Sequence, residues 1–225
     1  MTMLMPMLDE LELRKEICRV ARSLFERGYV HATAGNISAR LADGFLITPS
    51  DACLGFLEPA DIARIGVDGA QLSGARASKA LVLHRSIYET DRTAACVIHT
   101  HSTSLVALTL SGVWTRDDIV LPITPYFVMK VGHVPLIEYH RPGDPAVGSL
   151  VALAIVRMRE RGTPIRAVML DRLGPNVWHE SPAAAMAVLE ELEETARLWL
   201  NCNPRPEPLT AAQIDELRRH FGASW

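Results

Sequence analysis

An apolar run that ends in two histidines, A-A-C-V-I-H-T-H over residues 94–101, constrains this chain more than any other feature. Small and apolar residues in an unbroken run before His99 are typical of a buried strand. Side chains two positions apart in a strand point to the same face, so His99 and His101 converge on one side. Neutral imidazole suits zinc, and the pair supplies two of the three protein ligands that a catalytic zinc takes. The run therefore predicts a metal site at the end of a buried strand.

Helices and strands mix along the rest of the chain without strict alternation. Amphipathic periods and capping residues predict helices over 9–27, 78–89, 103–110, 144–161, 183–200 and 210–221. Apolar runs bounded by turn residues predict strands within 31–40, 44–48, 63–73, 94–99, 131–139, 166–170 and 176–178. We expect a single α/β domain, residues 1–225, with three layers: a central, mainly antiparallel sheet flanked by helices.

Composition and charge give no support for several classes of function. The net charge is −3 without a block of like charge, which gives no support for a nucleic-acid partner or an anionic membrane surface. Residues 1–8 are apolar but short and lack a basic flank, so we do not expect a signal peptide. The widely spaced cysteines are expected to be reduced thiols: Cys18, Cys53, Cys96 and Cys202.

The segment H-T-H-S-T at 99–103 resembles the metal motif of the class II aldolase/adducin family. Other family segments follow in order, namely H-A-T-A-G-N-I-S at 31–38, L-I-T-P-S at 46–50 and S-K at 78–79. The closest resemblance is to the 3-oxo-tetronate 4-phosphate decarboxylase branch. The branch segments are C-L-G at 53–55, L-P-I-T-P-Y at 121–126, V-G-H-V-P-L at 131–136, R-P-G-D-P at 141–145 and L-E-E-L-E-E-T-A at 189–196.

This resemblance implies a cytoplasmic sugar-phosphate lyase, a homotetramer with zinc near a subunit interface. The branch reaction decarboxylates a phosphorylated 3-oxo sugar acid to dihydroxyacetone phosphate and CO2. Loss of CO2 leaves electrons on the neighbouring keto group as an enediolate, which a divalent metal stabilises as a Lewis acid. Protonation at carbon then needs a general acid.

The resemblance also implies which residues bind the substrate. Tyr126 matches a position that contributes a catalytic hydroxyl from the neighbouring subunit, and an ordinary packing role is equally compatible with it. Lys79, expected among the catalytic residues with Tyr126, adds a positive charge at the start of a predicted helix, where an anion is favoured. Asp51 stands where a small residue is usual, and its carboxylate would oppose a phosphate. The expected phosphate-binding set is Gly35, Asn36, Ser38, Thr48, Ser50, Ser78 and Lys79.

Two positions depart from the family pattern. The acidic residue expected after S-K is Ala80, which can neither move a proton nor bind metal. The third metal histidine, expected in an N-H-G-P step, is Leu173. Two imidazoles alone leave an ion mostly hydrated, so the zinc site is expected to be weakened. Side chains that could compensate are His133, His140, His179, Asp171 and Glu138, and Asp171 is the one that shares a strand face with Leu173.

These departures leave alternative functions open. One is a degenerate family member that is kept for binding or assembly. Another is a changed chemistry, and a third is a sugar-phosphate aldolase or epimerase. The branch segments at 121–126 and 141–145 argue against the aldolase or epimerase. The retained histidine pair and phosphate residues argue against complete loss of the site.

Overall fold

A computed structural model describes residues 9–225, so the expectation about a leader in residues 1–8 lies outside the described part of the chain. One eight-stranded sheet lies at the centre, in the order β4-β3-β2-β1-β5-β8-β7-β6. Neighbouring strands are antiparallel except β6 and β7, which pair in parallel. The strands are β1 (Asn36–Leu41), β2 (Gly44–Ile47), β3 (Ala63–Gly66), β4 (Gln71–Ser73), β5 (Cys96–His99), β6 (Leu136–Ile137), β7 (Ala167–Leu170) and β8 (Gly174–His179).

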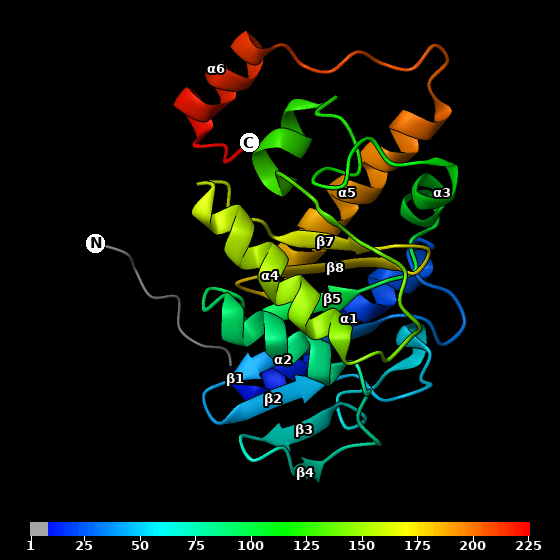
Figure 1. The fold of residues 1–225 in the computed structure, drawn as a ribbon. Helices are drawn as coiled ribbons and strands as arrows, with labels where there is room; N and C mark the ends of the chain where they lie inside the picture. The colour runs from blue at the N-terminus through cyan, green and yellow to red at the C-terminus, as the bar shows by residue number, and fades with distance from the viewer. Residues whose placement is uncertain (1–8) are drawn as a thin grey trace.

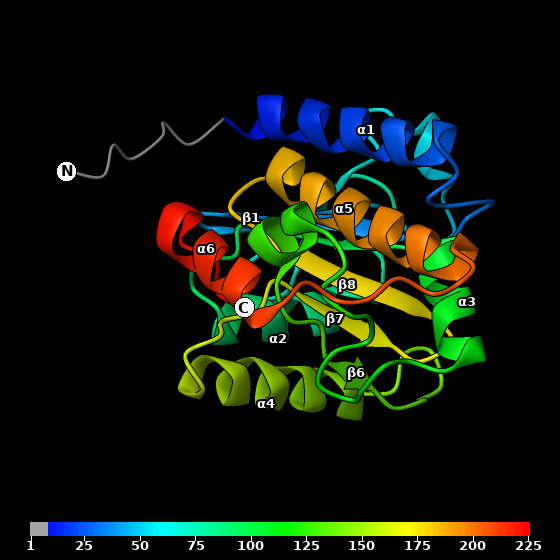
Figure 2. The same ribbon diagram turned by 90° about the horizontal axis from the view of Figure 1, so that it is seen from above.

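Helices cover both faces of the sheet, as Figure 1 and the view from above in Figure 2 show. α1 and α5 lie on one face, and α2 and α4 lie on the other. The helices are α1 (Glu10–Glu26), α2 (Leu81–Thr90), α3 (Thr103–Ser111), α4 (Ala146–Glu160), α5 (Pro182–Asn201) and α6 (Ala211–Phe221), with the short turns η1 (Leu54–Phe56) and η2 (Phe127–Val131). The predicted three-layer architecture with a mainly antiparallel sheet is confirmed.

Local sequence signals set several of these boundaries. Asp9 caps α1 by accepting the backbone N–H of Glu12 at 2.8 Å, as the capping pattern predicts. Ser181 caps α5 in the same way, with Pro182 in its first turn. Lys79, however, lies in the turn before α2, because that helix begins only at Leu81.

The two faces of β5 serve different layers. Cys96 and Ile98 pack in the core that includes α1 and α5. Val97 packs in the second core, with residues of α2 and α4. Because alternate side chains share a face, His99 follows Val97 onto the α2 and α4 side of the sheet. The strand thus places His99 at its end, on the face of the sheet that α2 and α4 cover.

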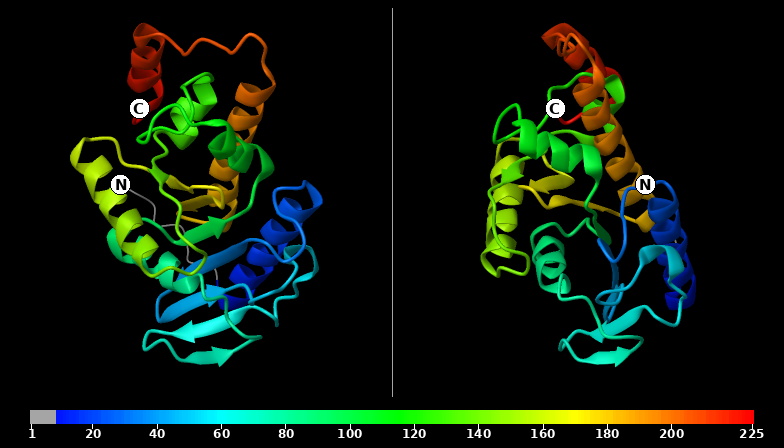
Figure 3. Two further views of the ribbon diagram at one scale, coloured as in Figure 1. Left: turned by 45° about the vertical axis from the view of Figure 1, so that its right-hand side comes forward. Right: turned by 90° about the vertical axis from the view of Figure 1, so that its right-hand side faces the viewer.

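The expected strand over 131–139 is largely wrong. Residues 127–131 form the π-helical turn η2, and only Leu136 and Ile137 pair with β7. Tertiary contacts override the extended preference of these residues, since the turn packs against α5 and α6. Figure 3 shows the segment after α6 returning toward this turn. There Trp225 stacks on His133, with ring centroids 4.3 Å apart.

The cysteines agree with the expectation of reduced thiols. All four cysteines are free thiols, two of them buried. Within residues 9–225, none of the helices has the length and apolar character needed to cross a bilayer.

Candidate active site

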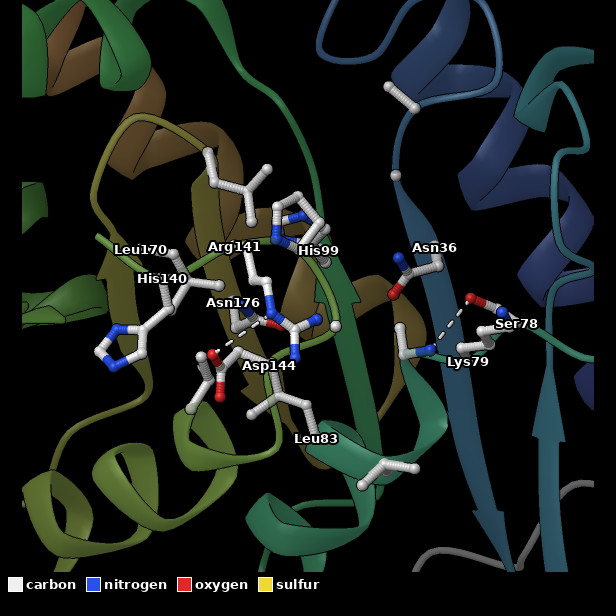
Figure 4. Close-up of a pocket in the computed structure, with 18 of the residues that line it drawn as sticks. Asn36, Ser78, Lys79, Leu83, His99, His140, Arg141, Asp144, Leu170 and Asn176 are labelled. Atoms are coloured by element: carbon white, nitrogen blue, oxygen red, sulfur yellow. Dashed lines mark hydrogen bonds and ion pairs between the residues drawn. The ribbon is translucent and has the colours of Figure 1, made fainter. Parts of the chain in front are cut away.

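A cavity of about 990 Å³ opens on the α2 and α4 side of the sheet. Its walls come from the loop before β1, the segments 49–51 and 76–80, the histidine pair at the end of β5, and the turn at 141–145. Figure 4 shows Asn36, Ser78 and Lys79 on one side, and His140 and Arg141 on the other. His99 lies between these two groups (Figure 4). The topology therefore gathers most of the predicted residues into one pocket.

His99 is held in a fixed orientation. Its Nδ1 donates a hydrogen bond to the carbonyl oxygen of Pro175 at 2.9 Å. A backbone carbonyl can only accept, so this bond leaves Nε2 free as a lone-pair donor toward the cavity. The ring is buried, and that burial lowers the pKa of His99 to about 4. His99 is accordingly a neutral imidazole at physiological pH, the form that binds metal.

His101 lies beside His99, with ring centroids 5.1 Å apart. Two imidazoles that share one zinc ion at about 2.0–2.1 Å have ring centroids roughly 5 Å apart, so this spacing suits a shared ion. Burial also lowers the pKa of His101, and the second cause is His31. The His31 and His101 ring centroids are 6.4 Å apart. His31 was not among the predicted metal ligands, although its loop was recognised.

The rest of a three-ligand metal site is absent from the described residues. Leu173 lines the cavity where the family resemblance implies a histidine, and Ala80 lines it where the resemblance implies an acid. Among residues 9–225, no three His, Cys, Asp or Glu side chains are grouped so that they could hold a metal ion. The donor set therefore fits a two-imidazole site with the other positions left to water or ligand oxygens.

The side chains expected to bind phosphate gather where two segments pair. Pro49 and Ala77 form an isolated antiparallel bridge, which places the hydroxyls of Ser50 and Ser78 on neighbouring stretches of chain. Ser50 donates to the carbonyl oxygen of Ala77 at 2.9 Å. Ser78 accepts the backbone N–H of Ala80 at 3.3 Å. Both residues line the cavity together with Asn36 and Lys79.

Gly35 allows the loop before β1 to approach the histidine strand. Its φ is +86°, which glycine adopts without strain. A Cβ there would lie 2.9 Å from the carbonyl oxygen of His99 and 2.8 Å from a methyl group of Val30. Any larger residue would therefore push the loop away from the histidines, so Gly35 shapes the cavity wall by its lack of a side chain.

Ser38 and Thr48 do not line the cavity, unlike the other expected phosphate residues. Both are fully buried. The Ser38 hydroxyl is hydrogen-bonded to His84 Nδ1 and to the Tyr88 hydroxyl, each at 2.7 Å. The Thr48 hydroxyl accepts the backbone N–H of Ile37 at 3.1 Å. These internal bonds give both residues a structural role, and we leave them out of the binding set.

The carboxylate of Asp51 has a partner at the cavity rim. It pairs with Arg76 at 2.7 Å, and both side chains are exposed. Asp51 has a φ of +58°, a left-handed conformation that aspartate tolerates better than most residues. An exposed pair of this kind adds little stability, but it neutralises the charge that was expected to oppose a phosphate.

The opposite wall carries a third cation, after Lys79 and Arg76. Arg141 belongs to the turn R-P-G-D-P and lines the cavity with Asp144, whose carboxylate lies 3.8 Å from the Arg141 guanidinium. Asp171 and Glu138 line the same wall. The turn was recognised in the sequence as a branch segment, but Arg141 was not singled out, because an arginine in a turn is usually solvated.

Tyr126 lies outside the cavity of its own chain. Its side chain is 62% exposed, at the start of η2. His133 is engaged elsewhere, since its Nδ1 is 2.8 Å from the Asp118 carboxylate. His179 also lies outside the cavity, whereas His140 lines it. Tyr126, His133 and His179 therefore do not contribute to the cavity of their own chain.

Asn176 is a cavity residue that the sequence reasoning missed. It is fully buried in β8 and lines the cavity beside His99. Neither its amide oxygen nor its amide nitrogen has a hydrogen-bond partner within the described protein. A lone asparagine inside an otherwise apolar strand pattern was the available signal, because buried polar groups need partners.

Comparison with known proteins places this geometry in context. The family model described as the Class II Aldolase and Adducin N-terminal domain matches residues 15–200. The chain is 53% identical over 224 residues to a protein of Cupriavidus necator named 3-oxo-tetronate 4-phosphate decarboxylase, with 97% of this chain and all of that protein covered.

More distant similarity extends to solved structures and to an aldolase. A crystal structure of YgbL from Escherichia coli, described as a putative aldolase/epimerase/decarboxylase, superposes with a TM-score of 0.82 at 39% identity. That match covers 93% of this chain and 99% of YgbL. The L-fuculose phosphate aldolase of Methanocaldococcus jannaschii is 33% identical over 131 residues, which is 58% of this chain and 69% of the aldolase.

Proposed function

This chain belongs to the class II aldolase and adducin family, and from that premise we propose that it decarboxylates a phosphorylated 3-oxo sugar acid. The substrate is of the 3-oxo-tetronate 4-phosphate type, and the products are dihydroxyacetone phosphate and CO2. One observation carries the proposal: the 53% identity to a decarboxylase of that name extends over essentially both chains. The aldolase similarity covers little more than half of this chain, so it supports the fold more than the reaction.

The cavity offers a cationic side chain to each anionic end of the substrate, beside carboxylates that include Asp144 and Asp171. Ser78, Asn36 and Lys79 supply hydroxyl, amide and ammonium groups on one side (Figure 4), and Ser50 adds a hydroxyl there through its bond to Ala77. We assign the phosphate to this side, because it offers donors with little bulk. Arg141 on the opposite wall supplies a guanidinium, which matches a carboxylate well. Phosphate and carboxylate would then lie at opposite ends, with His99 between them.

The reaction breaks the bond between the carboxylate carbon and C2. The electron pair of that bond moves into a new double bond between C2 and C3, and the C3 keto oxygen takes the negative charge. CO2 leaves, and a proton added at C2 completes dihydroxyacetone phosphate. The cations around the cavity favour the developing oxyanion, since charge in a partly dehydrated pocket is stabilised more strongly than in water.

His99 and His101 are the residues that would hold a divalent cation, zinc being the proposed one. When bound, the ion supplies Lewis-acid stabilisation of the developing oxyanion. The support for this assignment is the neutral, fixed Nε2 of His99 and the neighbouring His101 ring. With Leu173 in place of a third ligand, we propose binding that is weak compared with a three-ligand site.

The missing acid at Ala80 calls for another source of the proton at C2. Tyr126 of a neighbouring copy is our proposed donor, because tyrosine can act as a general acid and this one is exposed on its own chain. We infer a cytoplasmic homotetramer in which the cavity lies near a subunit interface. Sedimentation of the wild-type protein, together with complementation of Tyr126→Phe and His99→Ala subunits in mixed assemblies, tests this arrangement.

An activity assay separates the proposed reaction from the aldolase alternative. The purified protein is supplied with zinc and either a 3-oxo-tetronate 4-phosphate or L-fuculose 1-phosphate. We expect dihydroxyacetone phosphate from the first and no cleavage of the second. Cleavage of fuculose phosphate without decarboxylation would assign the chain to the aldolases, and binding without any product would assign it to a non-catalytic role.

A further inference from the structure

Most of the buried polar atoms that lack a hydrogen-bond partner lie close to His99. Among residues 9–225, six buried side-chain atoms lack a hydrogen-bond partner. Four of them belong to three residues close to His99: Asn36 Oδ1, His84 Nε2, and both polar atoms of Asn176. Native proteins leave few such atoms unpaired, and each one calls for an explanation such as a ligand or water. The concentration marks a place where a ligand or an ordered water would supply the missing partners.

The register of the sheet places these residues side by side. Asn36 in β1 is directly opposite His99 in β5, and His99 is directly opposite Asn176 in β8. Residues paired in this way point to the same face of the sheet. Asn36, His99 and Asn176 therefore form a row across three strands, and all three line the cavity. His84 of α2 covers the same face, where it is bonded to Ser38.

Asn176 is the residue of this row in which both polar side-chain atoms lack a hydrogen-bond partner. It is fully buried, so neither end of its amide reaches bulk water. A buried asparagine can donate two hydrogen bonds and accept two, and here the protein supplies partners for neither group. Burying a polar group without partners is unfavourable, and an apolar residue would suit a strand core better. The amide is thus costly for folding unless a ligand or an ordered water supplies its partners.

We propose that Asn176 is a substrate-binding residue that recognises a neighbouring keto and hydroxyl pair on the sugar acid. This inference rests on the proposed function and adds a specificity determinant to it. The amide N–H donates to the C3 keto oxygen, where negative charge develops as CO2 leaves. The amide oxygen accepts from the C2 hydroxyl. An amide is uncharged and carries its donor and its acceptor on two separate atoms, so it can serve both groups of the pair at the same time.

The position of Asn176 agrees with this role. It lies next to His99 in the row, away from the phosphate side, and Arg141 lines the cavity on the same wall. A substrate whose phosphate binds at Ser78 and Lys79 would extend its carbon chain across His99 toward Asn176. The N–H of the amide then adds an oxyanion donor in a site that lacks both the acid at Ala80 and the ligand at Leu173.

Calorimetric titration of the full-length protein tests this proposal with two probes, dihydroxyacetone phosphate and inorganic phosphate. The first probe carries the keto and hydroxyl pair, and the second carries only the phosphate end. Asn176→Val keeps a similar volume, suits a strand and removes both hydrogen-bonding groups. We expect Asn176→Val to weaken dihydroxyacetone phosphate binding at least tenfold, which is about 1.4 kcal/mol. Its affinity for phosphate should stay within twofold of wild type.

Two further variants separate recognition from a general disturbance of the site. Ser78→Ala should weaken the binding of both probes, because it removes a hydroxyl group from the phosphate side of the cavity. Val168→Ala alters the buried apolar neighbour paired with Asn176, and should leave both affinities within twofold. Thermal unfolding should show that Asn176→Val is at least as stable as wild type, since an unpartnered buried amide has been removed.

The possible results distinguish the claims. Equal binding of dihydroxyacetone phosphate by wild type and Asn176→Val overturns the role of Asn176 and leaves the proposed function intact. A joint loss of stability and of both affinities in Asn176→Val also overturns it, in favour of a structural role. Phosphate binding without any dihydroxyacetone phosphate binding in the wild type contradicts the proposed function itself, together with this inference.

Discussion

The Nδ1 atom of His99 donates to the carbonyl oxygen of Pro175 at 2.9 Å, which joins the end of β5 to the start of β8. This bond fixes both the tautomer and the ring orientation of the histidine, as outer partners do for metal-binding imidazoles. The lone pair of Nε2 is thereby directed to the cavity before any ligand arrives. Most of the metal behaviour that we expect of the chain follows from this single arrangement.

Replacing His99 with alanine should abolish specific zinc binding. The neighbouring His101 would be left as one imidazole, which holds an ion only weakly. Elemental analysis and titration with zinc measure the effect, with His220→Ala as a matched exposed-histidine control on α6. Unchanged zinc content in His99→Ala would mean that the ion binds elsewhere.

Leu173→His should restore the third ligand and strengthen zinc binding by at least about 100-fold. Changes to outer partners alone alter metal affinity by 10–100-fold, and a direct ligand should have a larger effect. Leu173 already lines the cavity, so the new ring has room to face the existing pair. Competition against a zinc chelator gives the affinity. An affinity equal to that of wild type would show that the loop at 171–175 holds position 173 away from the histidines.

Ala80→Glu should raise the decarboxylation rate by about 10²–10⁴-fold, the usual contribution of a positioned general acid. Ala80 lines the cavity immediately before α2, where the helix dipole tolerates a carboxylate. Turnover under saturating substrate measures the change. No increase in a correctly folded variant would indicate that protonation is already supplied from another group, with Tyr126 of a neighbouring copy as the group to test next.

Lys79→Met should raise the KM for the phosphorylated substrate about 10- to 100-fold. Hydrogen bonds to charged groups contribute roughly 1.5–3 kcal/mol, and methionine keeps the length of the side chain while removing the charge. Lys130→Met is the matched control, because that lysine lies outside the cavity. If both variants raise KM equally, the effect is a general one of net charge and the assignment of Lys79 to the phosphate is wrong.

His84 should make the fold sensitive to acid. Burial lowers the pKa of His84 to about 3, whereas an unfolded histidine titrates near 6.5. The folded state therefore binds fewer protons between these values, so stability is complete above about pH 6.5 and falls as the pH drops toward 3. His84→Gln should reduce the slope of the unfolding free energy against pH by up to about 1.4 kcal/mol per unit.

Denaturant unfolding at several pH values between 4 and 7 measures that slope. His220→Gln, on the exposed face of α6, removes an imidazole without changing the core and serves as the control. An identical pH dependence in wild type and His84→Gln would contradict the assignment of the buried neutral state.

Regular patterns explain why so much of the fold could be predicted. The helices α1 and α5 carry side-chain caps at their starts, and β5 is an unbroken apolar run. The turn η2 could not be predicted in this way, because its conformation depends on packing against α5 and α6 rather than on local preference. Ser38 and Thr48 show the same limit, since their hydroxyls face internal partners that no local pattern identifies.

The site was predictable where it follows strand geometry and less so where it depends on distant segments. His99 and Asn36, which their motifs singled out, both line the cavity. Asn176 needed the register of β5 and β8, which brings a residue 77 positions further along the chain opposite His99. Arg76 and Asp51 form an ion pair although they lie 25 positions apart in the sequence, so this pairing could not be predicted from local patterns.

Carbon-13 NMR of the purified wild-type protein with a 3-oxo-tetronate 4-phosphate labelled at the carboxylate carbon tests the central claim most directly. We predict that the label appears as CO2 and bicarbonate, in equal amount to the dihydroxyacetone phosphate formed and faster than in a sample without protein. If Ser78→Ala and Lys79→Met each lose this acceleration, the decarboxylation takes place in the cavity. If the substrate binds to the protein but the label leaves the sugar acid no faster than without protein, the account is contradicted.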